Sequence, residues 1–221
     1  TQEAYQGLVP SDCLLMLGTD YCLLRPEFRR YRPQSLKRRM LPSSHIQQLL
    51  ITMGGVDLGD YTSQLLQLIP EMEFLPVDLK ILVIMGPGAP HIENVMVEAK
   101  KNRFAVEVKT AIHNMAEVMT QSDLAIGAAG STAWERCCLG LPFINIVVAE
   151  NQQAIGDELS RLNVADSIQA LQSNGLCFDS LSHALKALVS ETERQHKTQV
   201  SAELINGEGV YRVIQEIETI C

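Results

Sequence analysis

The 221-residue sequence has few aromatic residues, few charges and no long apolar run. Aromatic residues make up 5% of the chain and charged residues 20%, against 46% hydrophobic residues. No stretch of about 18 apolar residues occurs, which argues against a membrane-spanning helix. The net charge of -8 argues against a general nucleic-acid binder, because such a protein needs a basic surface. The apolar content is enough for one sizeable core or two small ones.

Cysteines at metal-binding spacing are also absent. Two of the six cysteines are adjacent on an expected helix, where they cannot easily serve one tetrahedral metal site. The sequence shows no secretory leader, and reduced thiols are typical of the cytoplasm. We therefore expect a cytoplasmic protein with reduced, buried thiols and with neither a metal nor a cofactor. The cysteines are Cys13, Cys22, Cys137, Cys138, Cys177 and Cys221.

Apolar runs alternate with amphipathic segments along most of the chain. This alternation is typical of an α/β protein with a Rossmann-like, doubly wound parallel sheet, in which ligands bind at the carboxyl ends of the strands. The patterns predict strands at 46–53, 79–85, 104–108, 124–127 and 143–148, and helices at 58–69, 93–102, 115–121, 132–139, 152–162, 181–189 and 210–220.

The first 42 residues do not fit this alternation. A stretch rich in proline and arginine runs up to Pro42, and its basic residues between Arg29 and Arg39 predict a solvated linker. A contact with phosphate or lipid is the alternative. We expect residues 1–42 to be the end of a missing N-terminal domain together with an interdomain linker. Residues 43–221 are then a Rossmann-like nucleotide-binding domain with C-terminal helices.

The stretch from Ala125 to Pro142 predicts a strand, a turn of small residues and a helix. Unpaired amides at the start of such a helix bind anions, so the turn Gly130-Ser131-Thr132 is a candidate phosphate site. Glu135, one turn later, would accept hydrogen bonds from two ribose hydroxyls. Alternatively, the turn only caps the helix and Glu135 is its capping-box partner.

Three further loops leave predicted strands at the same edge of the sheet. Gly54 and Gly55 would let the backbone approach a diphosphate, although they form neither a dinucleotide fingerprint nor a Walker loop. The loop that follows Val108 could hold a base through its backbone groups or be an ordinary connection. Asn151 and Gln152 would bring amides to this edge, unless Asn151 is simply a helix N-cap.

Several segments together resemble the UDP-sugar hydrolases of pseudaminic acid biosynthesis. In that family the enzyme cleaves UDP-2,4-diacetamido-2,4,6-trideoxy-β-L-altropyranose into UDP and 2,4-diacetamido-2,4,6-trideoxy-L-altrose. The resemblance runs from about Leu14 to the end. It extends more distantly to the peptidoglycan N-acetylglucosaminyltransferase, and it implies the C-terminal nucleotide-binding half of a glycosyltransferase-B type fold. The matching segments are Arg25-Pro26-Glu27-Phe28, Met53-Gly54-Gly55-Val56-Asp57, Asn114-Met115-Ala116, Gly130 to Pro142, Ala149-Glu150-Asn151-Gln152 and Asn206-Gly207-Glu208-Gly209.

The resemblance implies a set of ligand contacts but no catalytic residue. In the family a histidine near an N-terminal glycine-rich loop assists the attack of water, and no histidine of this chain lies in such a motif. The implied partners are UDP and a UDP-linked amino sugar, with no nucleic acid and no membrane, and we expect a monomer. Val56 departs from the small polar residue usual at its position. UDP would contact Gly54, Gly55, Val108, Gly130, Ser131, Thr132 and Glu135, and the sugar side would contain Asp57, Asn151, Gln152 and Arg25.

Other functions stay open at this point. The same fold and pocket would suit the donor-binding half of a glycosyltransferase or a non-catalytic module that binds nucleotide sugars. A purely structural α/β domain would leave Glu135 without a role in binding. We expect the complete enzyme to displace UDP by water, with backbone dipoles rather than a metal stabilising the diphosphate. This chain alone is then expected to bind UDP and to hydrolyse little.

Overall fold

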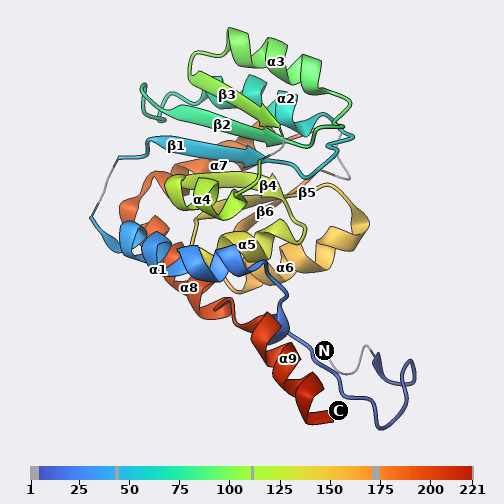
Figure 1. The fold of residues 1–221 in the computed structure, drawn as a ribbon. Helices are drawn as coiled ribbons and strands as arrows, with labels where there is room; N and C mark the ends of the chain where they lie inside the picture. The colour runs from blue at the N-terminus through green and yellow to red at the C-terminus, as the bar shows by residue number, and fades with distance from the viewer. Residues whose placement is uncertain (1–4, 43–44, 111, 171–174, 221) are drawn as a thin grey trace.

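A computed structural model describes residues 5–42, 45–110, 112–170 and 175–220. Its centre is a parallel six-stranded sheet with the strand order β3-β2-β1-β4-β5-β6 (Figure 1). The order turns back between β1 and β4, as in doubly wound nucleotide-binding folds. The sheet therefore confirms the predicted Rossmann-like class. The strands are β1 (Gln48–Thr52), β2 (Lys80–Met85), β3 (Ala105–Thr110), β4 (Leu124–Ala128), β5 (Phe143–Val147) and β6 (Asp166–Gln169).

Helices cover both faces of the sheet and form the two outer layers (Figure 1). One apolar cluster joins the sheet to α2, α3 and α7, and the other joins it to α1, α4, α5 and α6. The α-helices are α1 (Pro26–Met40), α2 (Tyr61–Leu68), α3 (Ile92–Lys101), α4 (Met115–Gln121), α5 (Thr132–Cys138), α6 (Gln153–Arg161), α7 (Phe178–Val189), α8 (Glu191–Leu204) and α9 (Gly209–Ile220), with 3₁₀ turns at Thr19–Tyr21, Ile69–Glu71 and Glu150–Gln152.

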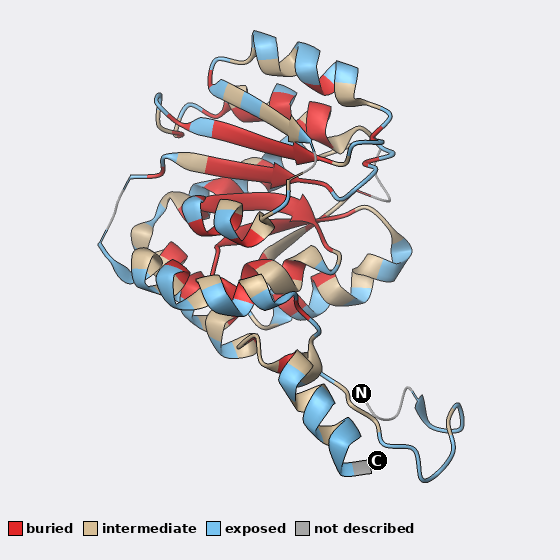
Figure 2. Ribbon diagram, in the orientation of Figure 1, coloured by how far each residue is buried: buried red, intermediate tan, exposed pale blue. Residues whose placement is uncertain are grey.

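The central strands are apolar on both faces because each face packs against helices. In β1, Leu49 and Ile51 belong to one cluster, whereas Leu50 between them belongs to the other. Strands β4 and β5 are buried along their whole length (Figure 2). Continuous apolar runs of this kind predicted β1, β2, β4 and β5. The structure confirms these four strands and also the predicted β3, whose residues are exposed or half-buried.

The strand β6 and the helix α8 were not predicted. β6 has only four residues, and Ile168 is its one buried residue, so no apolar run in the sequence predicts this strand. α8 buries polar side chains such as Thr198 and Ser201 rather than an apolar stripe. Its first turn is capped by Ser190, whose hydroxyl accepts a hydrogen bond from the Glu193 amide. Hydrophobic periodicity therefore carried little information about either element.

The expectation of a solvated linker before Pro42 is wrong for residues 26–40, because they form the helix α1. Phe28 and Ser35 of this helix are completely buried. The Arg32 guanidinium donates to the carbonyl oxygens of Cys138, Ala202 and Ile205. The basic residues thus satisfy carbonyl groups at the ends of α5 and α8, which explains how an arginine-rich segment packs into the domain.

Arg39 shows the same use of charge near the end of α1. Its guanidinium donates to the carbonyl oxygens of Met119, Ser122 and Leu139. Burial lowers the pKa of Arg39 to about 9, and the neighbouring Arg38 adds to the shift. The side chain stays charged at neutral pH and ties α1 to α4 and α5.

The cysteines agree only in part with the expectation of buried thiols. Cys137 and Cys138 are completely buried, and burial raises the pKa of the Cys137 thiol to about 12. Cys13 and Cys177 are exposed, so burial was wrong for these two. All the described cysteines are free thiols, and Cys221 lies outside the described residues.

The helix α9 extends away from the sheet beside the N-terminal segment (Figure 1). Its residues Tyr211, Ile214 and Ile217 are spaced three apart and are exposed. Leu8 and Leu14 of the neighbouring segment are exposed as well. Among the described residues, no helix has the length and apolar character needed to cross a membrane.

Candidate functional site

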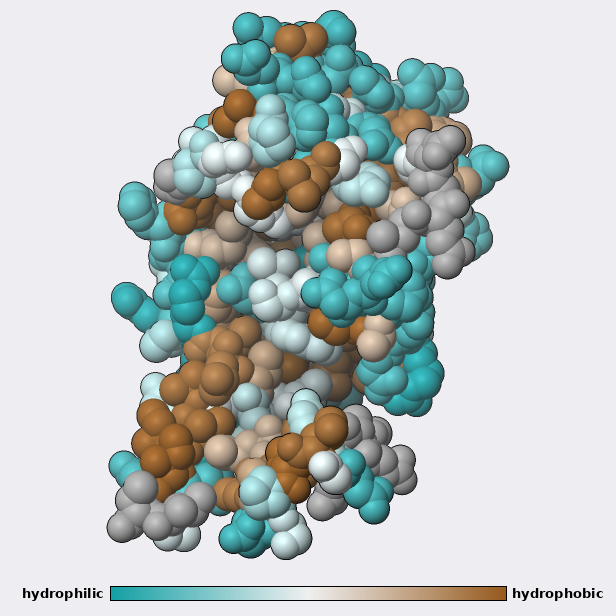
Figure 3. Space-filling view, turned by 90° about the vertical axis from the view of Figure 1, so that its right-hand side faces the viewer, coloured by the Kyte–Doolittle hydropathy of each residue, from teal (hydrophilic) through white to brown (hydrophobic). Residues whose placement is uncertain are grey.

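The carboxyl ends of β1 and β4 lie side by side where the strand order turns back. Ile51 pairs with Ile126 and Thr52 pairs with Gly127, so the loops after these two strands begin next to each other. Figure 3 looks onto this edge of the sheet and shows a pale surface of intermediate hydropathy across its middle. Ligands of open α/β sheets bind at such a switch point. The two loops contain Gly54, Gly55, Gly130, Ser131 and Thr132, which were predicted as ligand contacts.

The loop after β1 is held by a close contact with the loop after β2. Gly54 has a φ of 90°, a conformation that favours glycine, and both Gly54 and Gly55 are exposed. A Cβ atom on Gly86 would clash with the carbonyl oxygen of Gly55. Sequence analysis missed Gly86, although the Gly86-Pro87-Gly88 segment directly after a buried strand is a recognisable turn signal.

Replacing Gly86 with alanine is expected to destabilise the protein by about 1–3 kcal/mol, because the new methyl group must displace the Gly55 backbone. The shifted loop should also weaken binding of any ligand that needs the Gly54-Gly55 backbone. Gly88→Ala is the matched control, since its Cβ atom would meet nothing within 4 Å. Equal unfolding midpoints for the two variants in urea would contradict the prediction.

The turn between β4 and α5 has the form that the sequence predicted. α5 begins at Thr132, with Ser131 exposed and Gly130 half-buried before it. No described group donates a capping hydrogen bond to the Ser131 side chain, so the alternative of a capping turn finds no support at Ser131. The amides of Ala133 and Trp134 donate instead to the carbonyl oxygens of Gly130 and Ser131.

Glu135 lies in the first turn of α5 and meets the residue that precedes α1. Its Oε1 atom is 3.6 Å from Nη2 of Arg25, and Nη1 of Arg25 is 3.0 Å from Oε1 of Glu27. The Glu135 side chain is 16% exposed. Burial raises the pKa of its carboxyl group above the usual value, and the attraction of Arg25 and Arg136 only partly offsets this. The structure thus brings together two predicted site residues, Arg25 and Glu135.

The raised pKa of Glu135 predicts a stability cost of its ionised form. An acid whose pKa is higher in the folded state stabilises the fold below its unfolded pKa, and this stability is lost as the pH rises through the folded pKa. Glu135→Gln is therefore expected to raise the thermal unfolding midpoint at pH 7, with the gain vanishing well below pH 4.5. Thermal scans from pH 3 to pH 8 measure this effect, and a lower midpoint at pH 7 would contradict it.

Asp57 is buried and organises the loop after β1. Its φ of 48° is positive, and its Oδ1 and Oδ2 atoms accept hydrogen bonds from the amides of Tyr61 and Thr62 at 3.0 and 2.9 Å. The carboxylate therefore caps α2. A direct contact of Asp57 with the sugar stays a prediction.

The other predicted residues come from different strands and loops. Val108 is inside β3, where it pairs with Val83 of β2, and the strands β2 and β1 separate β3 from β4. Asn151 is exposed in the 3₁₀ turn after β5 and is not the N-cap of α6, which is Gln152. The Oε1 atom of Gln152 accepts a hydrogen bond from the Val148 amide. Among the described residues no hydrogen bond joins these three residues to the glycine loops, and their ligand contacts stay predictions.

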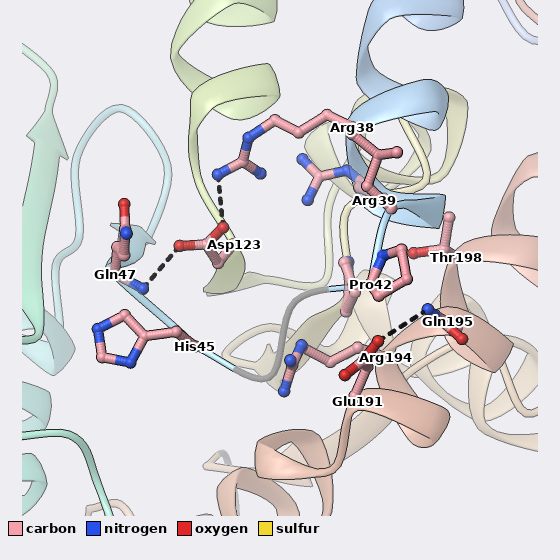
Figure 4. Close-up of a pocket in the computed structure, with 12 residues that line it drawn as sticks. Arg38, Arg39, Pro42, His45, Gln47, Asp123, Glu191, Arg194, Gln195 and Thr198 are labelled. Atoms are coloured by element: carbon pink, nitrogen blue, oxygen red, sulfur yellow. Dashed lines mark hydrogen bonds and ion pairs between the residues drawn. The ribbon is translucent and has the colours of Figure 1, made fainter.

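A cavity of about 300 Å³ lies at the opposite, amino-terminal edge of the sheet (Figure 4). Asp123, just before β4, accepts hydrogen bonds from the amides of Gln47 and Gln48 and pairs with Arg38 at 2.5 Å. Arg38 thus joins α1 to the start of β4, whereas Arg194 of α8 donates to two carbonyl oxygens at the end of α7. The cavity is therefore separate from the predicted nucleotide site.

Comparison with known families identifies the domain. Residues 49–217 match the family described as the glycosyltransferase family 28 C-terminal domain. The matched span begins in β1, ends in α9 and includes all six strands. The chain therefore belongs to this family.

Two curated relatives are named for spore coat polysaccharide biosynthesis and for the hydrolysis of a UDP-sugar. The chain is 28% identical over 138 residues to the spore coat polysaccharide biosynthesis protein SpsG of Bacillus subtilis, covering 62% of this chain and 38% of that protein. It is 24% identical over 157 residues to the UDP-2,4-diacetamido-2,4,6-trideoxy-beta-L-altropyranose hydrolase of Campylobacter jejuni, covering 71% of this chain and 52% of that enzyme. The chain thus spans only about half or less of these relatives.

Solved structures confirm the fold class. MurG of Acinetobacter baumannii superposes with a TM-score of 0.70 at 16% identity, covering 96% of this chain and 58% of that chain. The UDP-GlcNAc 2-epimerase of Neisseria meningitidis, bound to UDP-GlcNAc, gives a TM-score of 0.68 at 12% identity, covering 99% and 58%. At these identities the likeness concerns the fold, which is the Rossmann-like half of a glycosyltransferase-B type structure.

Proposed function

We propose that this chain is the UDP-binding half of an enzyme that hydrolyses UDP-2,4-diacetamido-2,4,6-trideoxy-β-L-altropyranose in pseudaminic acid biosynthesis. The products would be UDP and 2,4-diacetamido-2,4,6-trideoxy-L-altrose. The observation that supports a nucleotide site is the meeting of two glycine-containing loops at the switch point of the sheet, with Glu135 beside them. The relative from Campylobacter jejuni supports the choice of reaction.

In this proposal each part of the site has a separate task. The backbone of Gly54, Gly55 and the Gly130-Ser131-Thr132 turn holds the diphosphate, because unpaired amides and the helix dipole favour negative charge. Glu135 accepts hydrogen bonds from the ribose hydroxyls. The backbone near the end of β3, after Val108, faces the base.

The sugar side of the proposed site contains Arg25, Asp57, Asn151 and Gln152. Arg25 can move from its ion pair with Glu135, since its side chain is about half exposed. Asp57 contributes by fixing the loop that precedes α2. Asn151 is exposed and free to turn toward a ligand.

The proposed chemistry is the displacement of UDP by water at the anomeric carbon. Backbone dipoles at the switch point would stabilise the departing diphosphate. A general base outside this chain would activate the water. We propose further that residues 1–42 contain the end of a preceding domain and the connection to it, with α1 packed onto the domain described here rather than solvated.

Isothermal titration of the chain with UDP, beside UMP and CDP, tests the proposal. Saturable binding that weakens for UMP supports a diphosphate site, and weaker binding of CDP supports recognition of the uracil base. Incubation of the full-length protein with the UDP-sugar should then release UDP and the free sugar without an acceptor. Absence of UDP binding by both the chain and the full-length protein would overturn the proposal.

A glycosyltransferase is the second candidate, and the match to the glycosyltransferase family 28 C-terminal domain favours it. Both functions need the same nucleotide pocket, so binding of UDP does not separate them. Release of UDP that depends on an added acceptor would favour the transferase. A full-length protein that binds UDP but neither hydrolyses nor transfers the sugar would instead be a binding module.

A further inference from the structure

The side chain of Arg136 bridges the two ends of the turn between β4 and α5. This side chain is completely buried. Nη2 donates to the Ala128 carbonyl oxygen at 2.8 Å and to Oγ1 of Thr132 at 3.0 Å, while Nε donates to the Thr132 carbonyl oxygen at 3.2 Å. The guanidinium thus ties the last residue of β4 to the first residue of α5. The backbone between these two points is the Ala129-Gly130-Ser131 turn.

The charge of Arg136 is only partly offset by its surroundings, because the carboxylate of Glu135 attracts it and raises its pKa without forming an ion pair. No described carboxylate forms an ion pair with it, and its Nη1 atom is buried without a hydrogen-bond partner. The guanidinium lies 4.8 Å from the centre of the Phe143 ring. Burial lowers the pKa of Arg136 to about 10, so the group stays charged at neutral pH.

A buried charge without an ion pair is costly, so the position of Arg136 calls for an explanation. Gly127 makes room for this side chain, because a Cβ atom there would lie 2.9 Å from Nη2. Arg39 offers a comparison, since it also braces carbonyl groups and has a lowered pKa. Each of the two arginines also has a nearby carboxylate that raises its pKa, Asp123 for Arg39 and Glu135 for Arg136. They differ in position, since Arg39 lies at the opposite edge of the sheet.

We propose that Arg136 is a positioning residue for a nucleoside diphosphate: it fixes the β4–α5 turn, and the bound diphosphate adds negative charge near a buried guanidinium that forms no ion pair. This inference rests on the proposed function. This role differs from that of a purely structural brace. The contribution of the diphosphate to the binding affinity should depend on the charge of Arg136, whereas the contribution of the nucleoside should not.

Arg136→Met and Arg136→Lys separate these two roles. UDP binding is measured by calorimetry, and uridine binding by ligand-observed NMR, for the wild type and both variants. Arg136→Met should weaken UDP binding by about tenfold or more and change uridine binding by less than about twofold, since a tenfold change equals about 1.4 kcal/mol. Arg136→Lys keeps the charge and should recover part of the loss. Arg39→Met is the matched control, which should lower thermal stability without changing the ratio of UDP to uridine affinity.

The outcomes distinguish this inference from the proposed function. If the wild type does not bind UDP, the proposed function fails. If it binds UDP, and the ratio of UDP to uridine affinity is the same in wild type and in every folded Arg136 variant, the role of Arg136 is overturned. Should neither variant fold, NMR of the arginine guanidinium groups in the wild type decides. UDP, but not uridine, should then shift a buried guanidinium signal, and an unchanged set of signals would overturn the inference.

Discussion

Replacing Glu135 with alanine is expected to weaken UDP binding by about 1–3 kcal/mol, because hydrogen bonds between a carboxylate and the ribose hydroxyls are lost. Calorimetric titration measures the effect directly. Lowering the pH should also weaken UDP binding by the wild type. The pKa of Glu135 is raised, so affinity should begin to fall at a higher pH than the titration of an exposed glutamate would give.

Glu117→Ala is the matched control for this substitution. Glu117 also lies in the first turn of a short helix that follows a strand, but α4 belongs to the loop after β3 and Glu117 is exposed. Its removal should leave UDP affinity within about 0.5 kcal/mol of the wild type. Equal losses of affinity for the two variants would remove Glu135 from the proposed ribose site.

Replacing Phe28 with alanine is expected to lower the free energy of unfolding by about 3–5 kcal/mol. Phe28 is completely buried and packs in the cluster that joins α1 to the sheet. A loss of this size would mean that α1 belongs to the folded domain. Urea denaturation followed by circular dichroism gives the value.

The matched control for Phe28 is Phe178→Ala at the start of α7, where the ring is 37% exposed. A cost below about 1 kcal/mol is expected there. If both substitutions had the same small effect, residues 26–40 would behave as the solvated linker that the sequence suggested.

The predicted and observed elements differ for reasons that particular residues make clear. The apolar runs of β1, β2, β4 and β5 marked them as buried strands, because a parallel sheet covered on both faces needs such runs. α1 was missed because its charges suggested solvent, whereas Arg32 and Arg39 in fact bind backbone carbonyl groups. No local pattern in the sequence indicates contacts with carbonyl groups that lie 170 and 80 residues away.

Some features of the candidate site could also be predicted from the sequence, whereas others depended on the tertiary structure. The glycine-containing turns after β1 and β4 and the position of Glu135 were visible in the sequence, since small residues between a strand and a helix form a local pattern. The contact of Arg25 with Glu135 and the approach of Gly86 to Gly55 could not be read there. Each joins segments whose proximity depends on the packing of whole elements.

The sequence by itself determined the α/β class, five of the six strands and the loops that contain small residues, because these follow from local apolar periodicity and from the conformational freedom of glycine. Only the tertiary structure decided which loops meet, through the strand order that places β1 beside β4. It also decided that Arg136 lies buried beneath the β4–α5 turn. Strand order and burial depend on long-range packing, which no single segment of the sequence encodes.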